Sequence, residues 1–121
     1  MTNSIYNSNP FPGITGTTTG VTVDAYVVAL TLTALGYAHK SIIITNTHGS
    51  ASLTFKVDGL ANRNSTNTYA IMGDTALAFG DKYLVEITKP YDSITLSVKS
   101  TAGSTPSAYE IQHIMQRSGS A

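Results

Sequence analysis

Three histidines and a large pool of hydroxyl side chains are the residues of this chain best suited to nucleophilic chemistry. The histidines are His39, His48 and His113, and the sequence has no Cys. Acyl transfer needs a Ser or Thr beside a base that a third group orients. His39 and His48 fall in predicted turns, and no Gly-x-Ser-x-Gly elbow is present. Because hydroxyls are so abundant, a Ser near a His is expected by chance, and no catalytic residue is predicted.

The carboxylates are also placed without a catalytic or metal-binding pattern. Paired carboxylates act in glycoside hydrolysis, and clustered ligands at fixed spacing bind Ca²⁺ or Zn²⁺. Here most of the acidic residues fall at predicted turns or on polar strand faces, and Asp is common in turns. No His-x-x-x-His or Asp-x-Asp-x-Asp motif occurs, so no enzyme activity, cofactor or metal is predicted. The acidic residues are Asp24, Asp58, Asp74, Asp81, Glu86, Asp92 and Glu110.

Composition limits the partners that this chain is expected to bind. Its 121 residues have a formal net charge of zero, and 12% are charged, about half the usual share. That balance gives no basic surface for nucleic acid. No apolar run approaches the ~20 residues of a membrane helix, and residues 1–10 have neither the positive region nor the apolar region of a signal peptide. We therefore expect synthesis in the cytoplasm and packing against other subunits through an uncharged polar surface.

From residue 24 onward the sequence predicts short β-strands. Leu53, Phe55 and Val57 alternate with polar residues, the clearest period-2 signal in the chain. Residues 41–45 are apolar on both faces, which predicts a central strand, and Gly80-Asp81 predicts a hairpin turn with Gly at a positive φ. The predicted fold is an all-β, antiparallel β-sandwich, Ig-like or jelly-roll-like, of seven to eight strands with an extended N-terminal arm. Its predicted core residues are Leu30, Ile43, Phe55, Val57, Val85, Ile87, Leu96 and Val98.

The predicted domain organisation is a flexible N-terminal arm at residues 1–23, a sandwich at 24–116 and a polar tail at 117–121. The arm is rich in Gly, Thr and Asn, with too little apolar surface to order alone. One interpretation is a disordered terminus. The other is an arm that orders against a neighbour, stiffened by two prolines. Its predicted partner-binding anchors are Ile5, Tyr6, Phe11 and Ile14.

The tyrosines allow two interpretations. Tyr37, Tyr69, Tyr91 and Tyr109 lie at or near predicted strand ends. A sugar-binding sandwich presents an exposed aromatic platform, often with Trp, and this chain has no Trp. Packing at the edge of the core, with a solvated hydroxyl, is therefore favoured over a sugar platform.

Four stretches carry a family resemblance. They are SIIITNT at residues 41–47, LTFKVDG at 53–59, AFGDKY at 78–83 and KPYDSITLSVKS at 89–100. Together they resemble small β-sandwich capsid decoration (cement) proteins of tailed-phage virions, over residues 24–115. The resemblance implies a shell-bound protein, often a trimer, that bridges capsomers built from the major capsid protein. It assigns no functional residue individually.

The functional hypothesis is therefore a virion structural protein, specifically a capsid decoration protein that binds and stabilises the major capsid shell. Its expected partners are the major capsid protein or other virion proteins and further copies of itself, with a trimer favoured and no nucleic acid or membrane. The expected location is the virion. One alternative is a tail, baseplate or head-fibre component of a phage. An alternative from another class is a carbohydrate- or surface-binding module.

Overall fold

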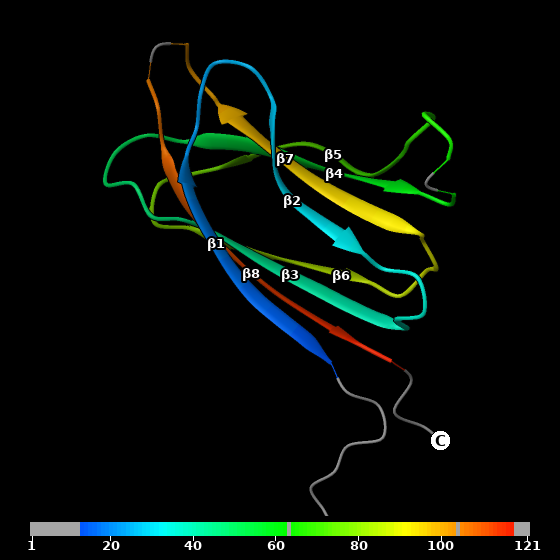
Figure 1. Cartoon of the computed structure of the whole chain (residues 1–121). Coiled ribbons are helices and arrows are strands. Elements are labelled where there is room, and N and C mark those ends of the chain that lie inside the picture. Colours follow the sequence, from blue (N-terminus) through cyan, green and yellow to red (C-terminus); the bar gives the residue numbers. More distant parts are fainter. Residues whose placement is uncertain (1–12, 63, 104, 118–121) are drawn as a thin grey trace, which may run out of the picture.

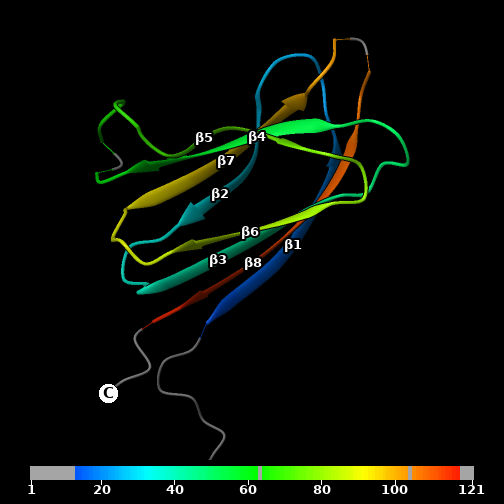
Figure 2. The ribbon, with the colours of Figure 1, turned by 180° about the vertical axis from the view of Figure 1, so that it is seen from behind.

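Two four-stranded antiparallel sheets stack face to face in the computed structural model, which describes residues 13–62, 64–103 and 105–117 (Figure 1). One sheet has the order β1-β8-β3-β6 and the other the order β2-β7-β4-β5. Figure 2 shows the same two layers from behind, with β5 over β6. The strands are β1 (Ile14–Val21), β2 (Val27–Thr33), β3 (His39–Asn46), β4 (Leu53–Leu60), β5 (Tyr69–Leu77), β6 (Lys82–Ile87), β7 (Ser93–Ser100) and β8 (Ala108–Gln116).

The strand pairing identifies the architecture as a jelly roll. β1 pairs with β8 and β3 with β6 in one sheet, while β2 pairs with β7 and β4 with β5 in the other. This is the pattern made when a long antiparallel ribbon rolls into two sheets. The prediction of an all-β sandwich is confirmed, with eight strands. The described residues contain no helix long and apolar enough to cross a membrane.

The core lies between the sheets and follows the period-2 alternation of the strands. Most predicted core residues are buried, as Phe55 illustrates with 0% exposure. Ile43 is an error: it faces outward and is 36% exposed, while Ile42 and Ile44 are buried. Residues 41–45 are apolar on both faces, so alternation alone did not fix which face points inward. The prediction that this segment is a central strand is confirmed, because β3 lies between β8 and β6.

The predicted arm is wrong over residues 14–21, which form β1. This strand pairs with β8 along its whole length, from Ile14 opposite Met115 to Val21 opposite Ala108. Its own side chains bury little, so an apolar count could not detect it. Ile14 heads the strand and is 44% exposed. The other predicted anchors, Ile5, Tyr6 and Phe11, lie outside the described residues.

Glycines in β1 explain how a strand with few apolar side chains joins the sandwich. A Cβ on Gly16 would lie 2.5 Å from Cε1 of His113, and one on Gly20 would lie 2.6 Å from Cζ of Tyr109. The two rings of β8 therefore lie directly against the β1 backbone. The missing Cβ atoms make this close approach sterically possible, and β1 is held by its neighbour's rings and by backbone pairing.

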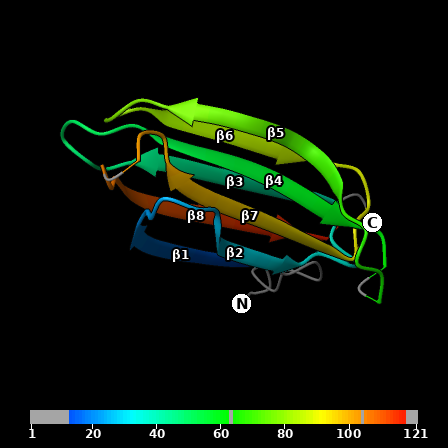
Figure 3. The same cartoon turned by 90° about the horizontal axis from the view of Figure 1, so that it is seen from above.

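The connection at residues 78–81 also differs from the prediction. Gly80 has a φ of 79°, as expected, but β5 and β6 belong to different sheets. The segment is therefore a crossover between the sheets and not a hairpin. Because β5 and β6 are edge strands, one open side of the sandwich lies between them, as seen at the upper rim of Figure 3.

Candidate functional site

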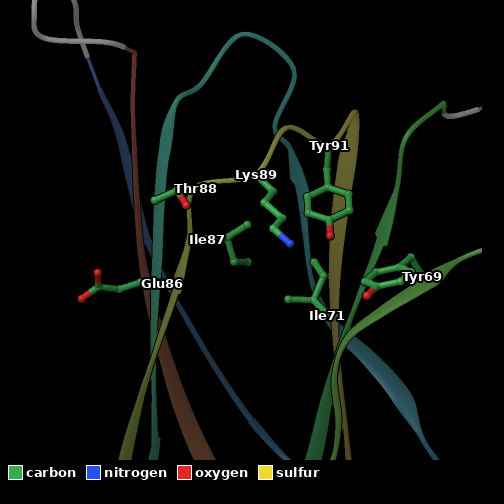
Figure 4. Close-up of a pocket in the computed structure, with 7 residues that line it drawn as sticks. All are labelled: Tyr69, Ile71, Glu86, Ile87, Thr88, Lys89 and Tyr91. Atoms are coloured by element: carbon green, nitrogen blue, oxygen red, sulfur yellow. The ribbon is translucent and has the colours of Figure 1, made fainter.

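A groove runs along the open side of the sandwich between the edge strands β5 and β6. Its central hollow has a volume of about 260 Å³ and is lined by Tyr69, Ile71, Glu86, Ile87, Thr88, Lys89 and Tyr91 (Figure 4). A second hollow adjoins it through the shared residues Ile71 and Glu86 and adds Met72, Tyr83, Leu84 and Val85. A third shares Tyr69, Lys89 and Tyr91 and adds Gly59, Ala61, Asn67 and Thr68. We call these three adjoining hollows the β5–β6 groove.

Two tyrosines from distant parts of the chain form one end of the groove. Tyr91 follows the β6–β7 turn and packs against the core. A Cβ on Gly59 would lie 2.5 Å from Cδ1 of Tyr91, so this glycine makes the space in which the ring rests. Tyr69 begins β5 directly opposite Gly59 in the register and is 66% exposed. The pairing of β4 with β5 thus places both rings beside one backbone position.

The groove has an apolar floor with charges at its margin. Ile71 and Met72 are half-buried against the core, and Ile87 is buried. In Figure 4, Lys89, Tyr91 and Ile71 point toward one another while Glu86 points away from them. This arrangement places no carboxylate beside a second acid or base inside the hollow. The groove therefore offers apolar side chains at its floor beside a cation, Lys89, at one end.

His48 and Ser107, which belong to the residue types considered above for catalysis, form hydrogen bonds that connect loops. His48 Nδ1 accepts hydrogen bonds from the backbone N–H groups of Ser50 (3.0 Å) and Ala51 (2.9 Å). Ser107 Oγ lies 2.9 Å from Asn46 Oδ1 and 2.9 Å from the carbonyl oxygen of Ala51, and its one proton can be donated to either acceptor. The side-chain amide of Asn46 donates to the carbonyl oxygens of Ala51 and Leu77. In the described structure these groups close one end of the sandwich, and no Ser–His pair is formed there.

Burial lowers the pKa of two basic side chains, His113 and Lys40. His113 faces the interior beside Gly16, its Nδ1 has no hydrogen-bond partner among the described residues, and burial lowers its pKa. Lys40 is buried at the end of β3 opposite Asn46, where Nζ donates to the carbonyl oxygens of Lys89 (2.8 Å) and Tyr37 (3.1 Å). Burial lowers its pKa as well. Residues 13–62, 64–103 and 105–117 contain no group of three or more His, Asp or Glu side chains arranged for a metal ion.

A polar cluster crosses the outer face of the other sheet. Tyr26 Oη donates to Asp74 Oδ1 at 2.6 Å. The Nζ atoms of Lys56 and Lys99 lie 4.5 and 4.8 Å from the centre of the Tyr26 ring. Burial first, and then the hydrogen bond to Asp74, raise the pKa of the phenol far above its ordinary value. The cluster joins the segment before β2 to strands β7, β4 and β5 and so braces this sheet.

Replacing Tyr26 with Phe should lower the free energy of unfolding at neutral pH. It should also make that free energy decline less at alkaline pH. The hydrogen bond to a charged acceptor contributes about 1–2 kcal/mol. Because the folded-state pKa is raised, this contribution is complete below pH ~10, where the unfolded phenol ionises, and declines above it. Urea midpoints at pH 7 and pH 11 test the prediction: the gap between parent and Tyr26→Phe should shrink at pH 11. A constant gap would contradict it.

Of the aromatic residues considered in the sequence, Tyr69 and Tyr91 are the ones that the fold brings together in a groove. Tyr109 is buried on Gly20, and the Tyr37 ring lies 5.1 Å from the guanidinium of Arg117. The sequence predicted core-edge packing for all four. That prediction suits Tyr91 and Tyr109 but fails for Tyr69, which is largely exposed. Its position at a strand end was visible in the sequence, whereas its nearness to Tyr91 depends on the sheet order.

Comparison with known proteins shows the fold. No family model matches the sequence, and no curated protein matches it. A solved structure from the disulfide-linked pili of Bacillus endospore appendages is 12% identical, with a TM-score of 0.59, over 97% of this chain and 100% of that chain. The Yersinia pseudotuberculosis-derived mitogen is 14% identical, with a TM-score of 0.57, over 84% of this chain and 86% of its own. PirA is 14% identical, with a TM-score of 0.54, over 82% of this chain and 90% of its own. At these identities the chain shares a fold with each of them, and fold alone does not specify function.

Proposed function

We propose that this protein is a non-enzymatic structural subunit of a multi-subunit assembly. The observation that carries the proposal is the β5–β6 groove, a hollow that has Ile71, Met72 and Ile87 at its floor and sheet edges as its two walls. Exposed strand edges are templates for pairing with another chain, and apolar grooves beside them bind extended segments. The match to a pilus subunit over nearly the full length of both chains supports the proposal, since that fold serves in a polymer.

More specifically, we propose a capsid decoration protein of a tailed phage, located on the virion and bound to the major capsid protein. The four stretches that resemble cement proteins support this role. The neutral net charge and the 12% of charged residues also support it, because uncharged polar surfaces lose less on desolvation when subunits pack. A homo-oligomer, with a trimer favoured, is the form we expect.

The test combines self-association with shell binding. The full chain should form a defined oligomer in light scattering, and it should co-sediment with shells of the capsid protein encoded in the same genome. Tyr69→Asp places a charge in the groove and should weaken one or both interactions. Thr31→Asp, on the exposed face of the edge strand β2, is the matched control and should weaken neither. A monomeric chain that binds no shell would overturn the proposal.

A carbohydrate-binding role is the second candidate, because Tyr69 and Tyr91 line one hollow with Lys89 and Asn67. Aromatic rings pack well against apolar faces and leave a polar rim for hydroxyl groups. Binding to a panel of glycans measures this directly. A saccharide bound by the parent and lost in Tyr69→Ala would favour this role over assembly.

A further inference from the structure

We propose that the β5–β6 groove receives residues 1–12 of a second copy of this chain, added as an extra strand along β6. This inference deepens the proposed function and rests on it, because it identifies the contact that links the subunits. The segment has no charged side chain and includes Ile5, Tyr6 and Phe11. Its character therefore matches the apolar floor formed by Ile71 and Met72.

Of the two strands that form the walls of the groove, β6 has the edge better suited to pairing with a further strand. All six of its residues pair in regular register with β3, from Lys40 opposite Ile87 to Thr45 opposite Lys82. β5, in contrast, shifts register against β4 at two places. A bulge disrupts the spacing of backbone donors and acceptors, so the regular edge of β6 is the one on which a further strand can continue the sheet.

The part of the donated segment between Ile5 and Phe11 and the strand β6 that accepts it have matching lengths. β6 has six residues, about 20 Å at 3.3–3.4 Å per residue. Ile5 and Phe11 are six positions apart, again about 20 Å in an extended strand. Because their separation is even, both side chains lie on the same face and can enter the groove together.

The two prolines of the donor segment, residues 1–12, leave only one of its edges able to pair with another strand. Pro10 and Pro12 have the same parity, so in an extended strand both of their nitrogen atoms face one edge, and neither can donate. Ile5, Asn7 and Phe11, of the opposite parity, keep their N–H groups on the other edge. Such a strand can pair along one side only, which is the position that proline tolerates in sheets.

The position of β1 favours a neighbouring copy over the chain's own groove. β1 and β6 are opposite edges of one sheet, as Figure 3 shows, and three strand spacings of about 4.8 Å separate them. Crossing that ~14 Å uses about four residues at 3.3–3.6 Å each. Residues 9–12 would then be outside the groove, and with them Phe11. A copy placed beside β1 leaves the whole segment for pairing.

The symmetry that follows is head-to-tail. The donor leaves one edge of the sandwich and the acceptor lies on the other, so each copy gives and receives. Such heterologous contacts close into rings or extend into filaments. A ring of three satisfies both the expected trimer and the exchange of segments. Phe11 buries about 150–250 Å² when enclosed, and Ile5 and the paired backbone add to this, so the donated segment supplies a large part of the ~800 Å² per partner of a stable interface.

The absence of Cys from the chain permits a direct test by disulfide cross-linking of full-length variants. Ser8→Cys labels the donor, because its parity puts this side chain on the face opposite Ile5 and Phe11. Leu84→Cys and Glu86→Cys, exposed on the outer face of β6, label the acceptor edge. Thr31→Cys, on the opposite side of the sandwich, is the control. Donor and acceptor variants carrying tags of different mass are mixed, oxidised and separated without reductant. We expect a mixed dimer with Leu84→Cys or Glu86→Cys and none with Thr31→Cys.

Each other result overturns the inference in a distinguishable way. A chain carrying both Ser8→Cys and the reactive acceptor substitution should cross-link between copies, and a disulfide within one copy would show that the segment fills its own groove. No cross-link at either acceptor, in an oligomer that persists, would refute the donor segment but leave the assembly role intact. A parent that is monomeric and binds no shell would refute both.

Association strength provides a second readout. Phe11→Ala should raise the dissociation constant of the oligomer by about tenfold to a hundredfold, since a buried aromatic anchor contributes a large share of binding. Ser8→Ala, in the same segment but with the other parity, should change it by less than about twofold. Equal effects of the two substitutions would contradict the proposed register.

Discussion

Phe55→Ala is expected to lower the free energy of unfolding by about 3–5 kcal/mol. Phe55 is fully buried on β4, a strand paired on both sides with β5 and β7. Its ring meets that of Tyr83 edge to face, with 5.6 Å between the centroids and 60° between the planes. Strands held on both sides cannot move inward to fill the space, so a cavity remains and the loss is near the upper end of the range. Chemical denaturation measures the change.

Phe79→Ala is the control for that substitution. Phe79 lies in the crossover after β5 and is 52% exposed. Truncating an exposed side chain usually changes stability by about 0.5 kcal/mol or less. The same denaturation midpoint for Phe55→Ala and the parent would show that β4 does not present Phe55 to the core.

Removing residues 1–20, so that the chain begins at Val21, is expected to destabilise the sandwich severely. The deletion leaves an edge of β8 unpaired and uncovers the inward rings of Tyr109 and His113, which rest on Gly20 and Gly16. Domain stability is only about 5–15 kcal/mol, and each 1 kcal/mol shifts the melting temperature of a domain of this size by about 4–8 °C. A whole strand is therefore expected to lower it by tens of degrees or to prevent cooperative unfolding. Thermal unfolding followed by circular dichroism tests this.

A version beginning at Gly13 separates the strand from the segment before it. It retains β1 and should melt, at concentrations where the protein is monomeric, at the temperature of the full chain. If the version that begins at Val21 melts with the parent, β1 is not an integral strand. If the version that begins at Gly13 melts far below the parent under these conditions, residues 1–12 stabilise their own copy.

The sequence predicted well those parts of the fold in which side-chain chemistry alternates. Leu53, Phe55 and Val57 alternate with polar residues, so the burial of these three side chains followed from the pattern. Two features were not predictable in this way. β1 has glycines where other strands have apolar side chains, because His113 and Tyr109 occupy the space. At Ile43, neighbours in the sheet decide the inward face, since the segment itself is apolar on both.

The groove was harder to predict for the same reason. Tyr69 and Tyr91 become neighbours only because β4 pairs with β5 and Gly59 leaves room for a ring. Neither the pairing nor the open side of the sandwich is encoded in local periodicity. The anchors Ile5, Tyr6 and Phe11 remain predictions, whereas Ile14 belongs to β1.

The rolled topology also determines when this protein can fold during its synthesis. Among the described strands, only β4 and β5 are neighbours both along the chain and within a sheet. The first strand pairs with the last, so one sheet stays incomplete until β8 has left the ribosome. Folding is slow because long loops must close before the contacts that stabilise them can form. Topologies of this kind fold in about milliseconds to seconds. Until then the edge of β3 that β8 will cover is open and invites pairing with other nascent chains, so we expect aggregation to compete with folding until translation reaches β8.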